Sequence, residues 1–384
     1  MTAAPASTNA DCMLAGRRMV LATETRVGTT GEGLANGFRA DGWCVHQIDP
    51  RQFFPNPRTP VRRLVTRLMR TSDISAYNSA IVEAVEQLRP QAFVTVKGVN
   101  IQPETLLRIG RMGAVTVNYY PDRDFDHLGL QIATLSLYHA FFTTKSYQLP
   151  FLQKLRGATR TSFLHHGYCD LVHIPHFATI EDHDYFADIT YVGNYSPYKE
   201  QWLRTIAHRL SGIRLRTVGS RWDYARDPAV KNAAIGHVLS GDFCAPVIQL
   251  SKINVAVHGD RNKVEGWQDL VSTRTFEIPA CKGFMLHIDN REVRELFERG
   301  REIDTFADEN ELIEKIVYYL ARPELRHEMI ERAYARGVPA YGYKARAAAL
   351  SRHIDGLLGT RTIIPPNAPA AEESVAVLSA PELL

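Results

Sequence analysis

The stretch that decides the fold runs from Ser272 to Asp289 and reads STRTFEIPACKGFMLHID. A helix that begins near Ser272 and ends at Gly283 would lead into the short apolar run 284–288, which is typical of a buried strand. The free backbone N–H groups at such a helix start, with the positive end of the helix dipole, form a natural site for a diphosphate. Short helix starts are also common without a ligand, so a plain helix with a surface carboxylate stays open as the alternative.

The side chains at the start of this helix match the groups of a nucleoside diphosphate. Arg274 carries a permanently charged guanidinium that suits phosphate oxygens. Glu277 can accept hydrogen bonds from both hydroxyl groups of a ribose. We therefore predict that Arg274, Thr275 and Glu277 bind a donor nucleotide.

Elsewhere, short apolar runs alternate with helical patterns, which is the signature of parallel βα units. The first series of predicted strands is 18–23, 43–48, 92–96, 115–119 and 140–143, and the second is 189–192, 215–218, 253–257, 284–288 and 302–306. Helices are predicted at 81–88, 104–112, 310–320 and 323–336. Residues 161–186 are rich in His, Pro, Asp and aromatic side chains, which is typical of an interdomain linker.

The length and composition fit two folded domains. A chain of 384 residues exceeds one ordinary hydrophobic core, and 45% hydrophobic with 23% charged residues is usual for a folded protein. The net charge of +3 is small, so the composition does not call for a nucleic-acid partner. Residues 1–16 and 359–384 lack periodicity and are predicted to be disordered.

The cysteines and the apolar runs bear on where the protein works. Five cysteines are scattered without a CxxC pair, which favours reduced thiols and an intracellular location. The apolar run after Arg18 is too short for a signal-peptide core or a membrane span. We expect a cytoplasmic protein, with peripheral contact to the inner face of a membrane as an open alternative.

The second half of the chain resembles the spore-maturation-protein CgeB-like glycosyltransferases. Residues 274–283 are similar to an Arg-x-Phe-Glu-x-x-Ala-Cys-Gly-like segment of that family, and an Asp follows the next strand at Asp289. A Phe-x-x-Gly-x-Glu pattern and a helix pair ending near Tyr343 and Arg346 continue the likeness, which covers residues 188–350 best. The resemblance implies an α/β protein of the GT-B fold, in which two Rossmann-like doubly wound domains face each other across a cleft.

The GT-B resemblance also assigns the two halves. It implies an N-terminal Rossmann-like acceptor domain at 17–175 and a C-terminal Rossmann-like nucleotide-sugar-binding domain at 176–358. It further implies a nucleotide sugar as co-substrate, with no metal and no other cofactor.

Two positions depart from the family pattern. Lys282 stands in a slot where family members often have Gly. Related retaining enzymes have an acidic residue at the position of Asp269, which is a shorter carboxylate here. We predict Asp269 as a catalytic candidate near the reacting sugar, with an ordinary loop Asp as the alternative.

A second group of donor-binding candidates follows the first strand of the second series. Gly193 allows the backbone to approach a phosphate closely, and Asn194 continues the turn. Lys199 supplies a cation. Trp222 follows the next strand and is predicted to stack on the nucleobase, with an aromatic that merely fills a loop as the alternative.

The first domain offers a glycine loop and a carboxylate. Gly28 and Gly31 follow the opening strand, where such loops approach donor phosphates and the acceptor. No Gly-Lys-Ser/Thr follows, so the loop is not a P-loop, and the glycines lie too far from the strand for a nicotinamide fingerprint. Asp122 follows a strand at 115–119 and is the catalytic candidate on the acceptor side, as a general base if the enzyme inverts configuration.

Two further patterns are open to more than one interpretation. His165, His166, Cys169, His173 and His176 are metal-ligand types, but their spacing matches no standard zinc pattern. The arginines at 62, 63, 67 and 70 flank an apolar helical face, which fits either an anionic membrane surface or packing on the protein's own sheet.

These observations predict a glycosyltransferase. It would move a sugar from a nucleoside diphosphate sugar to a hydroxyl of an unknown glycan, lipid or protein acceptor, with a cell-surface glycan as one candidate. The alternative is a catalytically degenerate GT-B domain that binds a glycan or a protein.

Overall fold

The computed structural model describes residues 16–54, 60–127, 129–235, 243–258 and 266–359, and the side chains of residues 60–68 lie outside this description. The chain divides into two compact units. Unit 1 contains the residues up to His165, a short segment ending at Trp267, and the chain from Tyr343 onward; unit 2 contains the rest. Apart from Gly16 and Gly359, the ends predicted to be disordered lie outside the described residues.

Unit 1 is built on a parallel sheet of six strands in the order β2-β1-β3-β4-β5-β6. The strands are β1 (Arg18–Ala22), β2 (Cys44–Ile48), β3 (Ala92–Val96), β4 (Val115–Tyr120), β5 (Ala140–Thr143) and β6 (Thr161–Phe163). The helices are α2 (Thr30–Ala40), α3 (Pro60–Leu88), α4 (Pro103–Arg111), α5 (Ile132–Leu135), α6 (Leu149–Arg156) and α14 (Tyr343–Gly359), with 3-10 turns η1 (Pro50–Gln52), η2 (Ser146–Gln148) and η3 (Ala158–Arg160).

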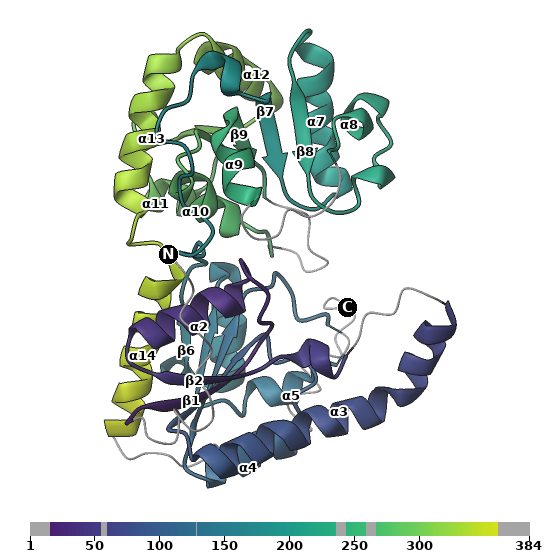
Figure 1. Cartoon of the computed structure of the whole chain (residues 1–384), viewed down its shortest axis with the longest axis vertical. Helices are drawn as coiled ribbons and strands as arrows, with labels where there is room; N and C mark the ends of the chain where they lie inside the picture. Colours follow the sequence, from purple (N-terminus) through teal and green to yellow (C-terminus); the bar gives the residue numbers. More distant parts are fainter. Residues whose placement is uncertain (1–15, 55–59, 128, 236–242, 259–265, 360–384) are drawn as a thin grey trace. The chain divides into compact units, whose positions relative to one another are not determined.

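Helices cover both faces of this sheet (Figure 1). Side chains of α3 and α4, among them Tyr77, Ile81 and Leu106, join Val20 and Phe93 of the sheet in one buried cluster. Helices α2 and α14 lie together on the other face (Figure 1). The unit is therefore doubly wound, as predicted.

Unit 2 is built on a parallel sheet of five strands in the order β11-β10-β9-β7-β8. The strands are β7 (Ala187–Val192), β8 (Leu215–Val218), β9 (Ser251–Ala256), β10 (Met285–Ile288) and β11 (Asp304–Phe306). The helices are α7 (Pro197–Arg209), α8 (Pro228–Asn232), α9 (Cys244–Gln249), α10 (Thr273–Ala280), α11 (Arg291–Leu296), α12 (Glu309–Leu320) and α13 (Pro323–Gly337), with 3-10 turns η4 (Asp182–Asp184) and η5 (Trp222–Tyr224).

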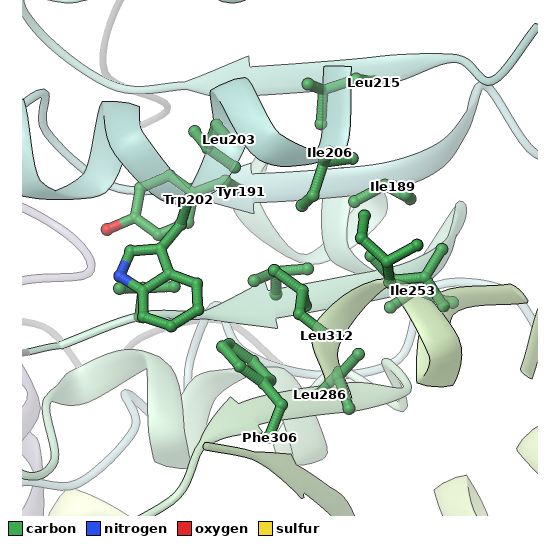
Figure 2. Packing of buried hydrophobic residues seen from close by; sticks show 14 of the residues in the cluster. Ile189, Tyr191, Trp202, Leu203, Ile206, Leu215, Ile253, Leu286, Phe306 and Leu312 are labelled. Carbon is green, nitrogen blue, oxygen red and sulfur yellow. The ribbon is translucent and has the colours of Figure 1, made fainter. Parts of the chain in front are cut away.

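The core of unit 2 shows why the apolar runs become buried strands. Ile189, Ile253 and Leu286 project from three neighbouring strands toward Leu203 of α7 and Leu312 of α12 (Figure 2). The opposite face packs against side chains of α9, α10 and α11. Because both faces are covered, the strands read as near-continuous apolar runs rather than alternating ones.

Local signals start several of the helices. The carboxylate of Asp308 accepts hydrogen bonds from the backbone N–H groups of Asn310 and Glu311, and so caps α12. Pro323 occupies the first turn of α13, where its missing N–H is not needed. These are the helix starts that the sequence predicts.

The fold class is confirmed, with three differences in detail. Strand β6 lies within 161–186, the stretch whose composition predicts an interdomain linker. Helix α14 belongs to unit 1, whereas the expected second domain, 176–358, included it. The chain passes into unit 2 after His165, so the expected boundary at 175 also differs from this division.

The return of α14 to unit 1 depends on small residues of α2. A Cβ atom placed on Gly33 would lie 2.4 Å from Cδ2 of Tyr343, and one on Gly37 would lie 2.6 Å from Cβ of Ala347. These distances are shorter than van der Waals contact, so the two helices can approach this closely only because α2 presents glycines here. Trp43 adds a hydrogen bond from Nε1 to Oγ of Ser351 on α14 (2.9 Å).

The thiols differ from the prediction at one position. Cys169, Cys244 and Cys281 are buried free thiols. Cys44 is disulfide-bonded, which corrects the expectation of reduced cysteines there. Spacing along the sequence could not show this, because a disulfide depends on the distance between two Cα atoms in the fold.

No helix among the described residues is both long and apolar enough to cross a membrane. The arginines at 62, 63 and 67 fall where side chains are not described, so the alternatives for that helical face remain open.

The α2–α14 contact gives a stability prediction. Gly37→Ala should lower the free energy of unfolding by about 1–3 kcal/mol, because the added methyl group overlaps Ala347 and the carbonyl oxygen of Tyr343. Gly356→Ala is the matched control, since nothing lies near that position of α14, and it should raise stability by up to about 1 kcal/mol. Urea unfolding monitored by circular dichroism measures both. Equal effects of the two substitutions would contradict the packing account.

Candidate functional site

The strand order of unit 2 indicates the edge of its sheet at which a ligand would bind. In chain order the strands are arranged 2-1-3-4-5 from the β8 end, so the topology reverses direction between β7 and β9. In open parallel sheets, ligands bind outside the carboxyl ends of the strands at this switch point. Gly193 follows the carboxyl end of β7, and His258 follows that of β9. We call the region around these two residues the β7–β9 edge.

Two glycines shape the β7–β9 edge. Gly193 has φ +152°, and a Cβ atom there would lie 2.6 Å from Nη1 of Arg274. Gly219, after β8, has φ +147°, and a Cβ atom there would lie 2.2 Å from the carbonyl oxygen of Gly193. Side chains are excluded at both positions, so the backbone itself forms the surface next to the Arg274 guanidinium.

Arg274 spans the switch point from the start of α10. Its Nη2 lies 3.3 Å from Nδ1 of His258, and its guanidinium carbon lies 5.4 Å from the ring centroid of Tyr191. Its Nε is buried and has no hydrogen-bond partner among the described residues. The guanidinium is therefore held at the β7–β9 edge, while its Nε–H group donates no hydrogen bond to the described residues.

Glu277 follows Arg274 by about one helical turn and has 15% of its side chain exposed. Oε1 of Glu277 lies 3.7 Å from Nε2 of His173. The backbone N–H of Cys169 donates to Nδ1 of His173 (3.0 Å), so a neutral His173 carries its proton on Nε2 and turns it toward Glu277. Burial lowers the pKa of His173, and the nearby Glu277 carboxylate opposes that shift.

Asn194 and Lys199 close the turn after β7. Lys199 Nζ donates to the carbonyl oxygen of Asn194 (3.1 Å), and Oδ1 of Asn194 accepts from the backbone N–H of Ser220 (3.1 Å). Ser196 caps α7 and accepts from the N–H of Lys199. The structure thus brings Gly193, Asn194, Lys199, Arg274 and Glu277 into unit 2 around α10 and the end of β7, and their role in donor binding stays a prediction.

Two predicted donor contacts need correction. Trp222 is 2% exposed, and its Nε1–H donates to the carbonyl oxygen of Gly193 (2.8 Å). Its ring packs edge-on against Tyr191 and Tyr195 in the core, so it supports the turn and cannot stack on a nucleobase. Thr275 is fully buried, and its hydroxyl faces His258 and His287 rather than a ligand.

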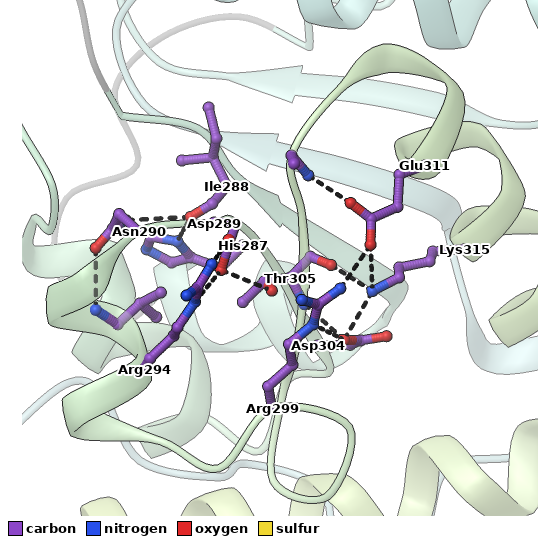
Figure 3. A network of polar contacts seen from close by, with 12 residues as sticks. His287, Ile288, Asp289, Asn290, Arg294, Arg299, Asp304, Thr305, Glu311 and Lys315 are labelled. Carbon is purple, nitrogen blue, oxygen red and sulfur yellow. Dashed lines mark hydrogen bonds and ion pairs between the residues drawn. The ribbon is translucent and has the colours of Figure 1, made fainter.

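Asp289, which carries part of the family resemblance, and Lys282, which departs from it, both have structural partners. The Asp289 carboxylate binds Arg294 and Thr305 (Figure 3), and the hydrogen bond from Arg294 lowers the pKa of this carboxyl. Lys282 has φ +55° just after α10, a left-handed conformation that favours Gly, and Nζ binds Glu331 of α13 (2.7 Å). Asp269 is half-buried in the segment that precedes α10.

In unit 1, Asp122 follows β4, and its carboxylate contacts the side chains of Lys97 and His127. Oδ2 of Asp122 lies 2.9 Å from Nζ of Lys97 and 2.7 Å from Nε2 of His127. Burial raises the pKa of the Asp122 carboxyl, but the contacts with His127 and Lys97 outweigh it and bring the pKa down to about 2. A carboxylate with so low a pKa is a weak base, which counts against Asp122 as the group that takes a proton from an acceptor hydroxyl.

The predicted glycine loop of unit 1 is partly a helix. Gly28 lies in the loop with φ +85°, whereas Gly31 lies in the first turn of α2. A Cβ atom on Gly31 would lie 1.9 Å from Oγ1 of Thr23, so this glycine allows close packing of α2 on the end of β1. That contact is a sufficient reason for Gly31, and the expected approach to a donor phosphate stays a prediction.

Sequence reasoning missed two residues of these sites. His287 lies inside β10 and reads as part of an apolar strand, and His127 lies in an irregular segment after β4. Neither has a local motif; a histidine in the middle of an otherwise apolar strand is the signal that could have pointed to His287. Among the described residues, no three His, Cys, Asp or Glu side chains gather as metal ligands, and this includes the histidines around Cys169.

Comparison with known proteins agrees with this fold. Residues 198–352 match a family described as glycosyl transferase-like. The sucrose-phosphate synthase of Thermosynechococcus elongatus is 13% identical over 90% of this chain and 100% of that chain, with a TM-score of 0.61. A glycosyltransferase of Rickettsia africae is 10% identical over 89% of this chain and 99% of that chain, with a TM-score of 0.60.

A third solved structure, HepE of Anabaena in complex with UDP and glucose, is 11% identical over 88% of this chain and 100% of that chain, with a TM-score of 0.56. No protein of curated function matches the chain by sequence. At these identities the likeness shows the fold, and the chain has the α/β fold of the GT-B glycosyltransferases.

The Asp122 cluster gives a pH prediction. The pKa of Asp122 is lower in the folded state than its ordinary value, so the ion pairs stabilise the fold above about pH 4 and this contribution is lost as the pH falls toward about 2. Asp122→Asn should cost about 2 kcal/mol at pH 7, and the difference from wild type should shrink below pH ~4. Urea unfolding at several pH values measures this difference.

Asp73→Asn is the control for this prediction. Asp73 lies on α3 and has no ion pair among the described residues, so its substitution should show no such pH dependence. A cost of Asp122→Asn that is the same at pH 3 as at pH 7 would contradict the ion-pair account.

Proposed function

We propose that this chain is a glycosyltransferase that uses a nucleoside diphosphate sugar as donor and binds it at the β7–β9 edge of unit 2. The observation that carries the proposal is the Arg274 guanidinium, held against the side-chain-free turn at Gly193 where the strand order reverses. A planar cation beside exposed backbone suits the oxygens of a diphosphate. The glycosyl transferase-like match, which includes Arg274 and Glu277, supports it.

The proposed donor pose follows from the spacing on α10. The diphosphate would contact Arg274 and the turn at Gly193 and Asn194, with Lys199 as a second cation. Glu277, about one turn further along, would accept hydrogen bonds from the ribose hydroxyls. Charge that develops on the leaving diphosphate would be stabilised by these fixed groups, and such stabilisation is where an enzyme of this kind gains most of its rate.

The remaining parts of the proposal concern the sugar and the acceptor. Asp269, before α10, is the proposed carboxylate near the transferred sugar. On the acceptor side we propose the Asp122–His127 cluster, with Asp122 orienting the imidazole and His127 taking a proton from the acceptor hydroxyl. The acceptor would be a hydroxyl group of a glycan, a lipid or a protein. We also propose that the chain is related to the CgeB-like glycosyltransferases.

Binding of nucleotides tests the donor site. HepE has been solved with UDP, so UDP is the first probe, with GDP and dTDP beside it in a thermal-shift and calorimetric panel. Arg274→Ala should weaken binding of the preferred nucleotide about 10- to 150-fold, because a charge-assisted contact of about 1.5–3 kcal/mol is lost. Arg352→Ala, an exposed arginine of α14, should bind like wild type. Equal affinity of the Arg274 and Arg352 variants would refute the site.

Analogues of the preferred nucleotide test the role of Glu277 separately. Wild type should lose about tenfold in affinity when the ribose hydroxyls are removed, as in 2′,3′-dideoxyuridine diphosphate compared with UDP. In Glu277→Gln this preference for the ribose should largely disappear, whereas Glu295→Gln on α11 should keep it. A Glu277→Gln variant that still discriminates like wild type would place the ribose elsewhere.

Turnover separates the enzyme from a binding module. Hydrolysis of nucleotide sugars without an acceptor, followed by release of the nucleoside diphosphate, should be measurable for the matching donor. A chain that binds no nucleotide and turns over no donor would instead be a degenerate GT-B domain that binds a glycan or a protein.

A further inference from the structure

Two buried histidines lie directly behind Arg274, and the donor pose proposed above does not use them. His258, after β9, is 3% exposed, and His287, inside β10, is fully buried. Their ring centroids lie 4.7 Å apart, and the hydroxyl of Thr275 touches both rings. These side chains come from β9, β10 and α10, so they connect the strands of the switch point to the helix that carries Arg274.

The direction of each hydrogen bond among these side chains follows from the contact between His287 and the carbonyl oxygen of Ile288. Nδ1 of His287 lies 2.6 Å from the carbonyl oxygen of Ile288, which can only accept, so Nδ1 carries the proton (Figure 3). Nε2 of His287 is then an acceptor, and the Thr275 hydroxyl 3.0 Å away donates to it. Since a hydroxyl has one hydrogen, Thr275 can only accept from its other neighbours.

The hydrogen bonds on the other side of Thr275 lead through His258 to the Arg274 guanidinium. Oγ1 of Thr275 lies 3.3 Å from Nε2 of His258, so His258 donates through Nε2–H. A neutral His258 then has its lone pair on Nδ1, where it accepts from Nη2 of Arg274 at 3.3 Å. The backbone N–H of Ser272 donates to the second lone pair of the Thr275 hydroxyl (3.3 Å). Each donor in this series meets an acceptor.

We propose that His258 and His287 are positioning residues, which hold the Arg274 guanidinium at the β7–β9 edge through a one-directional hydrogen-bond relay by way of Thr275. The inference rests on the proposed role of Arg274 in binding a diphosphate. None of the three relay residues would touch the ligand. Their function is to fix where the cation stands and which of its N–H groups remain available.

The relay anchors the cation without neutralising it. An arginine held by a carboxylate would meet an incoming diphosphate with part of its charge already compensated, whereas a neutral imidazole leaves the full charge in place. Burial, together with the nearby Arg274, keeps His287 neutral by lowering its pKa to about 4, against the opposing hydrogen bond to Ile288 and the charge of Asp289. His287 is therefore neutral at neutral pH, and the hydrogen bond from its Nδ1 to the Ile288 carbonyl oxygen fixes the tautomer.

The tautomers provide a direct test that needs no ligand. In ¹⁵N-histidine spectra of the wild-type chain at pH 7, His287 should appear as the Nδ1–H tautomer and His258 as the Nε2–H tautomer. The signals are assigned by their loss in His287→Gln and His258→Gln. The relay is overturned if the two rings share one tautomer, or if either ring is protonated on both nitrogens.

A pair of substitutions at Thr275 tests the effect on binding. Thr275→Val keeps the shape but removes the hydroxyl, and should weaken binding of UDP, or of whichever nucleoside diphosphate wild type prefers, about tenfold. Thr275→Ser restores the hydroxyl and should recover most of the lost affinity. A purely steric role predicts the opposite order, since valine matches threonine in shape better than serine does. Thr205→Val on α7, remote from the relay, is the control for a buried Thr→Val change.

Arg274→Ala is the reference in the same calorimetric experiment. If Arg274→Ala weakens nucleotide binding but Thr275→Val does not, the relay inference is wrong and the donor site stands. If Arg274→Ala itself binds like wild type, the proposed role of Arg274 fails and the inference falls with it. Should Thr275→Val not fold, the histidine spectra of wild type decide the matter alone.

Discussion

The candidate site depends on one close approach, that of the Arg274 guanidinium to the backbone of Gly193. A Cβ atom on residue 193 would lie 2.6 Å from Nη1 of Arg274, which is too close. The turn after β7 must therefore have glycine at this position for the arginine to lie where it does. That turn is itself held from behind, because Gly219 lets the β8 loop pass close to the Gly193 carbonyl and the Trp222 indole donates to it. The guanidinium and the backbone of the Gly193 turn then share one surface, an arrangement that suits the oxygens of a diphosphate.

Much of this could be predicted from the sequence because the deciding signals are local. Arg274 and Glu277 lie about one helical turn apart, so any helix that begins near Ser272 presents them together. The strands are equally local, since buried parallel strands read as short apolar runs whatever their neighbours are. Gly193 follows such a run directly, and its place at a strand end is therefore readable as well.

What the sequence could not supply depends on contacts between distant segments. Trp222 reads as an exposed loop aromatic until the turn at Gly193 is seen to need its N–H, and Thr275 reads as a ligand contact until His287 is found behind it. Gly33 and Gly37 follow closely on the predicted glycine loop, yet their partners lie on α14, in a different part of the chain. A glycine looks the same in the sequence whether it allows close approach to a ligand or close approach to a helix. Only the fold distinguishes the two.

The backbone conformation and the side-chain contacts of Lys282 explain why this position, where family members often have glycine, can hold a lysine. A left-handed residue other than glycine costs roughly 1–2 kcal/mol, which explains a preference for glycine after α10. Lys282 adopts this conformation while its ammonium group binds Glu331 and lies 5.0 Å from the ring centroid of Tyr334, both on α13. The substitution thus acts at the end of α10 opposite to Arg274 and joins it to α13. It changes how the helix ends and leaves the groups at its start in place, so it gives no reason to regard the proposed donor site as degenerate.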